Sequence, residues 1–295
     1  MLSRNLTVAA VTVAVLLACE SREQPGEGAL VDDTGHGVSL QAPPTRIVSL
    51  APGHTELLFA IGAGDRLVGR TRWCDYPPAV ESIPSVGDGL NPSVEGVLAQ
   101  NPDLVVFYAS PANEPAIARL QQLGIATVSL LTDDLEDFMR AADLLGDLTG
   151  ESERNDSLVA SLRHEISSLD ATRPRDSLPT VLLVAWGNPP VVIGGASFLS
   201  EIVELAGARN AFADVDRPSL TVSIETIVER NADLVLIASD SGIPAWTERP
   251  EWRVVPAVRD RRFIVVHGTE FSRPSFRAPA AVRRVRAALE EWRQP

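Results

Sequence analysis

The sequence contains no lysine, so all 26 of its basic residues are arginines, against 39 aspartates and glutamates. The formal net charge of -13 argues against nucleic acids and anionic lipids as partners, because an acidic surface repels both. Only two cysteines are present, Cys19 and Cys74. An exported chain without a disulfide framework depends on its apolar core, and we expect Cys74 to be buried in that core.

Motifs for nucleotide binding and for hydrolase chemistry are also missing. No GxGxxG follows a predicted strand, and neither GxxxxGK[ST] nor GxSxG occurs. A bare zinc or manganese site needs three or four converging ligands, and no such set can be assembled from the four histidines. Nucleotide binding, α/β-hydrolase chemistry and a bare metal centre therefore lack support in the sequence.

The N-terminus predicts export. Arg4 precedes a short apolar run that ends in LLAC, and these four residues resemble the bacterial lipoprotein cleavage box. We expect residues 1–18 to be a signal peptide and Cys19 to carry a lipid. The lipid would hold the protein on the periplasmic face of a membrane. An ordinary secretory signal followed by a coincidental cysteine is the alternative. Residues 19–37 are polar and turn-rich, which predicts a tether.

One stretch of the sequence occurs twice, at residues 93–107 and again at residues 223–237. Both copies predict a helix capped by a serine, then a turn, then a buried strand. Glu95 and Glu225 fall in the first turn of these helices, where the helix dipole favours a negative charge. The two copies lie 130 positions apart, and so long a separation indicates two similar half-molecules, each with its own sheet.

The rest of the chain alternates short apolar strands with helices, a pattern typical of parallel sheets covered on both faces. We therefore expect an α/β fold of two Rossmann-like lobes with mainly parallel sheets, at residues 38–150 and 173–295. A helix at 151–172, apolar along one stripe, would join the lobes and limit their hinge motion. Within this plan we expect Thr55 to cap a helix over 54–64, and GNPPVVIGG to be a loop.

Aromatic residues make up only 5% of the chain, yet several fall in predicted loops at the carboxyl ends of strands. Open sheets bind ligands at these loops, and flat apolar rings there are unfavourable in water unless something covers them. Each ring packing under its own loop is the alternative. The candidate ligand-binding rings are Trp73, Tyr108, Trp186, Trp246 and Phe271.

Polar candidates lie in the same loops. His54 and His267 each follow a predicted strand, either as hydrogen-bonded loop histidines or as contacts to a metal centre inside a chelate. We include His54 among the ligand-binding residues. Arg273 could pair with a carboxylate or phosphate of a ligand, unless it is an ordinary surface arginine.

These segments together resemble the periplasmic binding proteins that share a rigid interlobe helix and bind metal chelates, most closely the cobalamin-binding receptors of ABC importers. The resemblance runs from about Leu30 to about Trp292. It rests on the opening VDDTGHGVSL and PPTRIVSLAPGHTELLFAIGAGDRLVG, followed in order by WCDYPP, SVGDGLNPSVEGVLAQNPDLVV, WGNPP and TVSIETIVERNADLVLI.

The resemblance implies a solute-binding protein, not an enzyme, that has no intrinsic cofactor and is itself a monomer. It would capture cobalamin or another corrinoid between its lobes and deliver it to a permease dimer. It implies that Trp73, Tyr108 and Trp186 line the cleft and that Arg273 lies in the last cleft loop. It also implies that Glu95 and Glu225 dock on the permease. Helix-dipole compensation alone is the alternative role for these two glutamates.

Some positions depart from the cobalamin pattern. Gly89 and Ser219 stand where cobalamin binders can carry aromatic residues, and Thr269 and Glu270 replace an Asp-Trp pair. A ferric siderophore or haem receptor of the same fold is therefore the alternative. From another class, a secreted metal-dependent enzyme would need carboxylates and histidines converging on His54 or His267. A third possibility is a receptor domain that senses a ligand without transporting it.

Overall fold

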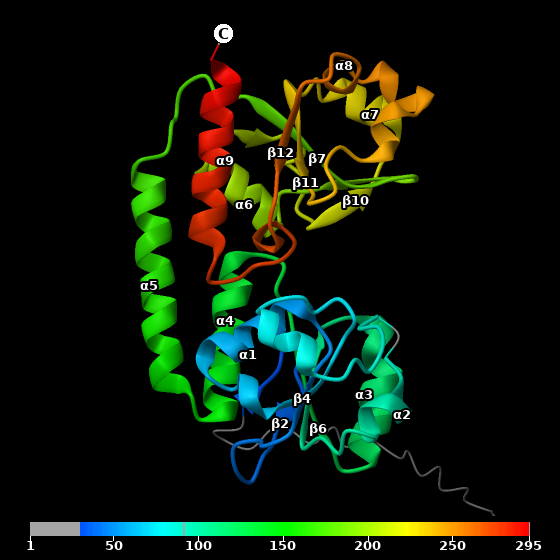
Figure 1. Cartoon of the computed structure of the whole chain (residues 1–295), viewed down its shortest axis with the longest axis vertical. Coiled ribbons are helices and arrows are strands. Elements are labelled where there is room, and N and C mark those ends of the chain that lie inside the picture. Colours follow the sequence, from blue (N-terminus) through cyan, green and yellow to red (C-terminus); the bar gives the residue numbers. More distant parts are fainter. Residues whose placement is uncertain (1–29, 91, 295) are drawn as a thin grey trace, which may run out of the picture.

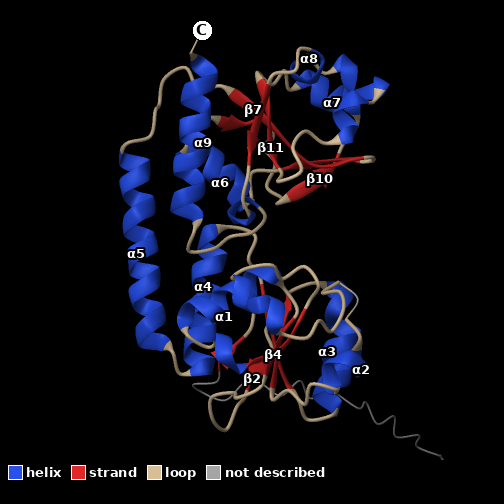
Figure 2. Cartoon of the chain, viewed as in Figure 1, coloured by secondary structure: helices blue, strands red, loops and turns tan. Residues whose placement is uncertain are grey.

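The structure, a computed structural model, describes residues 30–90 and 92–294 (Figure 1). The predicted signal peptide, the predicted lipidation site Cys19 and the first part of the predicted tether lie outside these residues. The elements from β1 to α4 form a first lobe, and those from β7 to α9 form a second. Figure 2 shows strands inside each lobe and helices outside. None of the helices in the described ranges has the length and apolar character needed to cross a membrane.

The first lobe contains a four-stranded parallel sheet in the order β4-β3-β5-β6. A two-stranded antiparallel hairpin, β1 with β2, precedes it. The strands of this lobe are β1 (Leu30–Val31), β2 (Gly37–Val38), β3 (Ile47–Ser49), β4 (Leu67–Arg70), β5 (Leu104–Tyr108) and β6 (Ala126–Leu130). Its α-helices are α1 (Pro52–Ile61), α2 (Val94–Leu98), α3 (Glu114–Gln122) and α4 (Leu135–Thr149).

The second lobe contains a mixed six-stranded sheet in the order β10-β8-β7-β11-β12, with β9 paired to β7. Its strands are β7 (Thr180–Gly187), β8 (Pro190–Ile193), β9 (Arg209–Asn210), β10 (Ser219–Thr221), β11 (Leu234–Ala238) and β12 (Phe263–Val266). Its α-helices are α6 (Phe198–Leu205), α7 (Ile224–Glu229), α8 (Pro256–Arg259) and α9 (Ala278–Arg293). Short 3-10 turns span Gly64–Arg66, Pro78–Ser82, Pro111–Asn113, Ala245–Glu248, Pro250–Val254 and Thr269–Phe271.

Two local expectations are wrong. The segment GNPPVVIGG is not a loop, because β8 runs through it and pairs antiparallel with both β7 and β10. Its three β-branched residues favour a strand, and Pro190 occupies the first strand position, where the missing N–H is tolerated. Thr55 does not cap α1, which begins at Pro52 with Ala51 as its N-cap. The buried Thr55 hydroxyl lies 2.8 Å from Ser49 Oγ and 3.0 Å from the Ala51 carbonyl.

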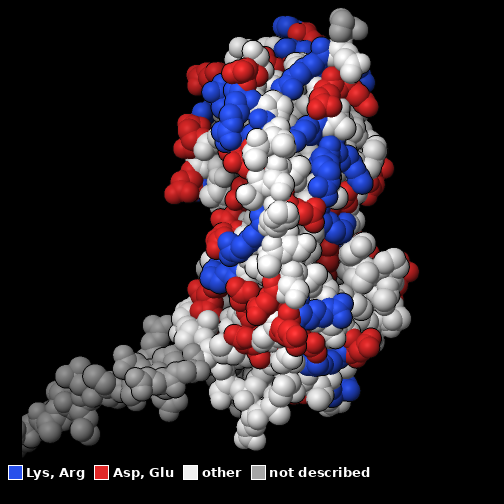
Figure 3. Space-filling model, turned by 90° about the vertical axis from the view of Figure 1, so that its left-hand side faces the viewer, with Lys and Arg blue, Asp and Glu red and all other residues white. Residues whose placement is uncertain are grey.

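The predicted connecting helix is α5 (Ser152–Ala171), and Figure 1 shows it running along one side of both lobes. Near its start, Arg154 Nε donates to the Ala60 carbonyl of the first lobe at 3.0 Å. Toward its end, Glu165 pairs with Arg283 of the second lobe at 2.9 Å. Figure 3 shows this face of the molecule, where acidic and basic side chains intermingle. Because contacts hold α5 to both lobes, it restrains their relative movement.

The lobes also touch directly at the start of α4. The Phe198 N–H of the second lobe donates to the Asp133 carbonyl at 2.8 Å. In the other direction, the Leu135 N–H donates to Glu201 Oε2 at 3.0 Å. The first-turn N–H groups of a helix have no partner within the helix, so Glu201 satisfies one of them.

The duplicated stretch folds the same way twice, as α2–β5 and as α7–β11. Ser93 and Ser223 each accept a backbone N–H at the start of the helix. Asn101 and Asn231 adopt nearly the same left-handed conformation, with φ of 47° and 45°. Left-handed backbone is uncommon outside glycine, and asparagine tolerates it well. The predicted repeat is therefore confirmed: the helix, the turn and the strand correspond in the two copies.

The apolar core is shared between the lobes. One buried cluster contains residues of both sheets together with α4, α5, α6 and α9. Across the boundary, Phe138 of α4 meets Phe276 edge to face, with ring centroids 5.0 Å apart. Each lobe adds a cluster of its own, around Phe107 in the first and Trp252 in the second.

Candidate ligand-binding cleft

A cavity of about 740 Å³ lies between the lobes. On the first-lobe side, its wall comes from the segments at the carboxyl ends of all four parallel strands, the edge at which open sheets bind ligands. The second lobe closes the cavity with residues of the β7–β8 hairpin, the start of α6 and the segments before β10 and α9. The lining includes Leu50–Gly53, Thr71, Trp73, Tyr108, Thr132, Asp133, Ala185, Ile193, Ser197, Phe198, Pro218, Ser219 and Ser272–Pro274.

Two of the predicted aromatic residues, Trp73 and Tyr108, line this cavity. The Trp73 side chain is 59% exposed, and its indole N–H donates to Asp88 Oδ2 at 3.3 Å. The Tyr108 hydroxyl donates to Asp133 Oδ1 at 2.6 Å. Burial, and next this hydrogen bond, raise the pKa of Tyr108 well above its ordinary value. The phenol therefore stays protonated, with its hydrogen directed at Asp133.

Trp186 stands beside the cavity rather than in its wall. It follows Ala185, a lining residue, at a bulge in β7 that shifts the register between Val184 and Trp186. Its ring is 65% exposed, and the indole N–H donates to the Asn188 carbonyl at 2.9 Å. Bulges redirect side chains, which accounts for two consecutive exposed residues at the end of this strand.

Trp246 does not lie on the cavity. Its ring packs on Trp252, with centroids 4.2 Å apart, directly against Gly187. A Cβ at Gly187 would come within 2.3 Å of Trp246, so only glycine fits there. The Trp252 indole donates to the Gly187 carbonyl at 3.0 Å. Trp246 therefore packs against the β7–β8 hairpin at Gly187. The expectation that Trp246 contacts the ligand is corrected, because its ring is part of this packing and not of the cavity wall.

Phe271 is also placed differently from the expectation. Its side chain is 1% exposed and belongs to the shared core, because the turn Thr269–Phe271 directs the ring inward. It does not line the cavity. The position of Phe271 in the sequence predicted a loop that faces the cleft. The loop instead folds so that the ring is buried in the core.

His54 is fully buried in α1 and does not line the cavity. Burial lowers the pKa of His54 to about 4, so its imidazole is neutral at neutral pH. Its Nε2 lies 3.5 Å from the hydroxyl of Thr132, which does line the cavity, and its Nδ1 has no hydrogen-bond partner among the described residues. His267 is exposed, 3.8 Å from Asp240. Across residues 30–90 and 92–294, no three histidine, cysteine or acidic side chains converge as a metal site would need.

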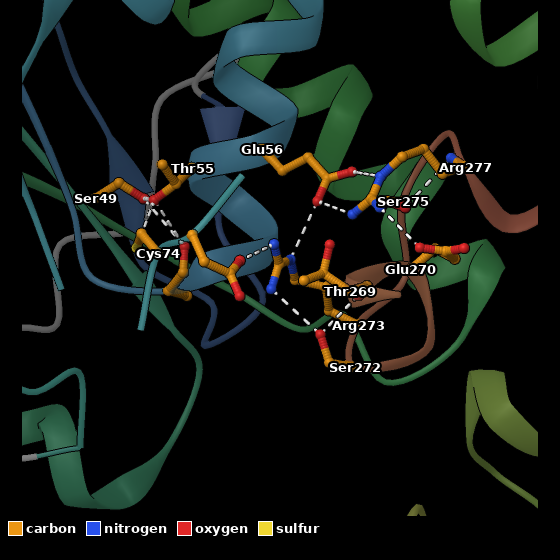
Figure 4. A network of polar contacts seen from close by, with 12 residues as sticks. Ser49, Thr55, Glu56, Cys74, Thr269, Glu270, Ser272, Arg273, Ser275 and Arg277 are labelled. Carbon is orange, nitrogen blue, oxygen red and sulfur yellow. Dashed lines mark hydrogen bonds and ion pairs between the residues drawn. The ribbon is translucent and has the colours of Figure 1, made fainter. Parts of the chain in front are cut away.

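Arg273 lines the cavity, but its guanidinium is already paired (Figure 4). Nε donates to Glu56 Oε2 at 3.1 Å, and Nη2 donates to Asp75 Oδ1 at 2.5 Å. Arg277 donates to both oxygens of the same Glu56 carboxylate, each at 2.7 Å. Glu270 pairs with Arg277 on the far side at 3.2 Å. These residues link α1 and the segment after β4 to the segment before α9, so they join the two lobes.

Gly89 and Ser219, where the cobalamin pattern allows aromatic residues, both line the cavity. A Cβ at Gly89 would lie 2.1 Å from the Leu50 carbonyl oxygen, so the backbone leaves no room for any larger residue. The cavity is therefore bounded at this point by main chain instead of by a ring.

Sequence reasoning missed the acidic residues of the site. Glu56 holds two arginines, and Asp75, Asp88 and Asp133 line the cavity. A signal was available for Asp75 and Asp133, since each lies in a loop just beyond a strand of the first lobe. Asp88 lies farther along, past the 3-10 turn Pro78–Ser82. No such signal marked Glu56, which lies within α1 like many other glutamates of the helices.

Glu95 and Glu225 occupy equivalent positions in the two lobes. Both side chains are exposed, one residue after the first residue of α2 and of α7. Figure 1 shows α2 and α7 on the side of the molecule away from α5. The structure thus presents two matching carboxylates, one per lobe.

Residues 47–269 match the periplasmic binding protein family, and the chain belongs to that family. Among its relatives is the uncharacterised ABC transporter substrate-binding lipoprotein YvrC of Bacillus subtilis, 29% identical over 240 residues that cover 78% of this chain and 75% of YvrC. The vitamin B12-binding protein of Vibrio parahaemolyticus is 27% identical over 247 residues, which cover 81% of this chain and 87% of that protein.

Solved structures show the same fold. The periplasmic haem-binding protein RhuT of Roseiflexus sp. RS-1, in its apo form, has a TM-score of 0.72 and 24% identity. The match covers 86% of this chain and 100% of RhuT. The predicted two-lobed α/β receptor fold is confirmed.

Proposed function

We propose that this protein is the lipid-anchored solute-binding protein of an ABC importer, and that it captures cobalamin or a related corrinoid between its lobes for delivery to a permease. The observation that carries the proposal is the cavity of about 740 Å³, walled by the carboxyl ends of four parallel strands and closed by the second lobe. The exposed ring of Trp73 on its wall offers a flat chelate a stacking surface. The name of the Vibrio relative supports the same ligand class.

In this proposal residues 38–150 and 173–295 are the two halves of a monomeric receptor, and residues 151–172 are the rod between them. The lipid on Cys19 would keep the receptor near its importer on the extracytoplasmic face. Glu95 and Glu225 would meet arginines on the two subunits of a permease dimer, because matching charges on two lobes suit a two-fold partner. Trp73, Tyr108 and Trp186 would contact the ligand.

A haem or ferric siderophore receptor is the second candidate. The glycine at position 89 and the serine at position 219 favour it, because they leave the cavity without the rings that cobalamin binders can carry there.

The test is a set of titrations of the purified mature protein with cyanocobalamin, haemin and ferrichrome, each followed by absorbance and by equilibrium dialysis. We expect saturable one-to-one binding of cyanocobalamin with a Kd on the order of 1 μM or tighter, equivalent to about 8 kcal/mol. Saturable binding of haemin or ferrichrome without any binding of cyanocobalamin would refute the corrinoid proposal and support a haem or siderophore receptor.

A further inference from the structure

The charged groups on the cavity wall are unevenly distributed. Three carboxylates line the cavity, and Arg273 is the single cation among its described lining residues. All three carboxylates belong to the first lobe. The residues that the second-lobe sheet and α6 contribute are neutral: Ala185, Ile193, Ser197, Phe198, Pro218 and Ser219. A bound molecule would therefore face an acidic wall on one side and an uncharged wall on the other.

Arg273 offsets only part of this asymmetry. Its Nε and Nη2 are directed at Glu56 and Asp75, and its Nη1 lies 3.2 Å from the Ser272 hydroxyl. A ligand carboxylate would have to displace one of these partners before it could pair with the guanidinium. The one lining cation is thus already paired within the protein, and the same pairing offsets the charge of Asp75. Asp88 and Asp133 are the lining carboxylates that Arg273 does not neutralise.

Asp88 lies in the segment between β4 and α2, where its contacts favour the ionised carboxylate. Its Oδ1 accepts the Leu90 N–H at 3.0 Å, and its Oδ2 accepts Arg72 at 2.6 Å. These bonds, that of Leu90 first, lower the pKa of Asp88. The Arg72 side chain is largely exposed to water, so solvent weakens its attraction for the negative charge of Asp88.

Asp133 removes the phenol of Tyr108 as a donor to the ligand. The hydroxyl hydrogen is directed at Asp133 Oδ1, 2.6 Å away. What remains available to a ligand at this place is acceptor capacity, from the phenol oxygen and from the second carboxylate oxygen. Among the ionisable side chains of the first-lobe wall, Asp88, Asp133 and Tyr108 therefore offer a ligand acceptors.

We propose that this cleft selects metal chelates that carry no carboxylate, and that it binds them through amide N–H or cationic groups turned toward Asp88 and Asp133. The inference rests on the proposed function and specifies its ligand class. A ligand carboxylate brought here would lose hydration and meet like charges, whereas an amide or ammonium would gain charge-assisted hydrogen bonds. Corrinoids bear neutral amide side chains and haem bears two propionates, so the wall favours the corrinoid.

The first test compares cyanocobalamin with its monocarboxylic acid, in which one side-chain amide has been hydrolysed. We expect the acid to bind at least about tenfold more weakly near neutral pH. In D88N and D133N variants, which keep hydrogen-bonding side chains of the same size, that ratio should fall toward one. D156N, on the exposed face of α5, is the matched control and should leave the ratio unchanged. Equal binding of the two corrinoids, or a ratio unaffected by D88N and D133N, would overturn the inference.

The second test uses haemin and haemin dimethyl ester, in which methylation removes the negative charge of both propionates. We expect the ester to bind more tightly than the free acid by at least about tenfold. Tighter binding of the free acid contradicts the inference even if no corrinoid binds. A protein that binds neither corrinoid but prefers the ester refutes the proposed corrinoid function and leaves the selection against carboxylates standing.

Discussion

Glu56 and Arg277 form a two-bonded ion pair between the lobes, with Nε to Oε1 and Nη2 to Oε2 both at 2.7 Å. The pair joins α1 of the first lobe to the segment that leads into α9. Together with α5 and the contact between α4 and α6, it is a third restraint on the relative position of the lobes. Ligand binding should therefore move the lobes little compared with receptors whose hinges are two flexible strands.

Removing the charge of Glu56 should destabilise the fold. In E56Q, two largely buried guanidiniums lose their shared carboxylate. Breaking a buried pair costs roughly 3–5 kcal/mol, and we expect the lower end because Arg273 keeps Asp75 and Arg277 keeps Glu270. Urea unfolding followed by circular dichroism measures the change.

The matched control for this prediction is E136Q, which removes an exposed ion pair with Arg163 at 3.2 Å. A pair in water contributes less than about 1 kcal/mol, so the control should unfold nearly as the wild type does. Equal effects of E56Q and E136Q would mean that the interlobe cluster adds no more stability than a surface pair.

Truncating Trp186 should weaken ligand binding. Its ring is exposed beside the cavity, and losing an aromatic stacking contact of about 1.4 kcal/mol corresponds to a tenfold rise in Kd. W186A should show that rise by isothermal titration, with an unchanged unfolding midpoint. V254A, which alters an exposed apolar residue elsewhere in the second lobe, is the control. An unchanged Kd in W186A would remove this ring from the site.

The paired glutamates should matter for transport and not for binding. In the E95A/E225A double variant, neither altered side chain reaches the cavity, so the ligand Kd should match that of the wild type. Uptake through the reconstituted importer should stop if, as we propose, these two carboxylates dock the protein on the permease. E153A, which removes an exposed first-turn glutamate of α5, controls for loss of helix-dipole compensation. Normal uptake in the double variant would refute the docking role.

Glu201 should make stability depend on pH. Burial, the largest cause, raises the pKa of Glu201 to about 7 from its ordinary 4.5, and Asp134, Glu204 and Asp137 raise it further, against the Leu135 N–H. Between pH 4.5 and 7 the folded protein therefore binds more protons at this site than the unfolded chain does. Its contribution to stability is complete below pH 4.5 and is lost as pH rises through 7.

The variant E201Q removes this titration and keeps an oxygen that can accept the Leu135 N–H. Relative to the wild type, we expect E201Q to be similar in stability near pH 4.5 and more stable at pH 8. Urea midpoints measured at intervals across this range give the comparison. Stability curves of the two proteins that run parallel across the whole range would show that Glu201 does not titrate as described.

The sequence predicted the parts of the fold that depend on local pattern. The repeated capping serine, helix and strand at 93–107 and 223–237 were readable because every signal lies within fifteen residues. The helix α5 was readable from its apolar stripe. The strand β8 was hidden because two prolines and two glycines surround three apolar residues, a composition typical of turns.

The site was less predictable because its geometry depends on contacts between distant parts of the chain. Glu56 and Arg277 are 221 residues apart, and no local pattern links them. Whether a loop ring faces the cleft or the core is decided by packing. Trp73 and Phe271 lie in comparable loops, yet one lines the cavity and the other is buried. Sequence thus located the loops, and tertiary structure decided which side chains they present.

The buried cluster that runs through both sheets has a thermodynamic consequence. If one lobe unfolded alone, it would expose apolar side chains of the other lobe to water. We therefore expect both lobes to unfold together on heating. Scanning calorimetry should then give a calorimetric enthalpy equal to the van't Hoff value, the signature of a single cooperative unit. By this measure the molecule would behave as one domain, although its chain forms two separate sheets.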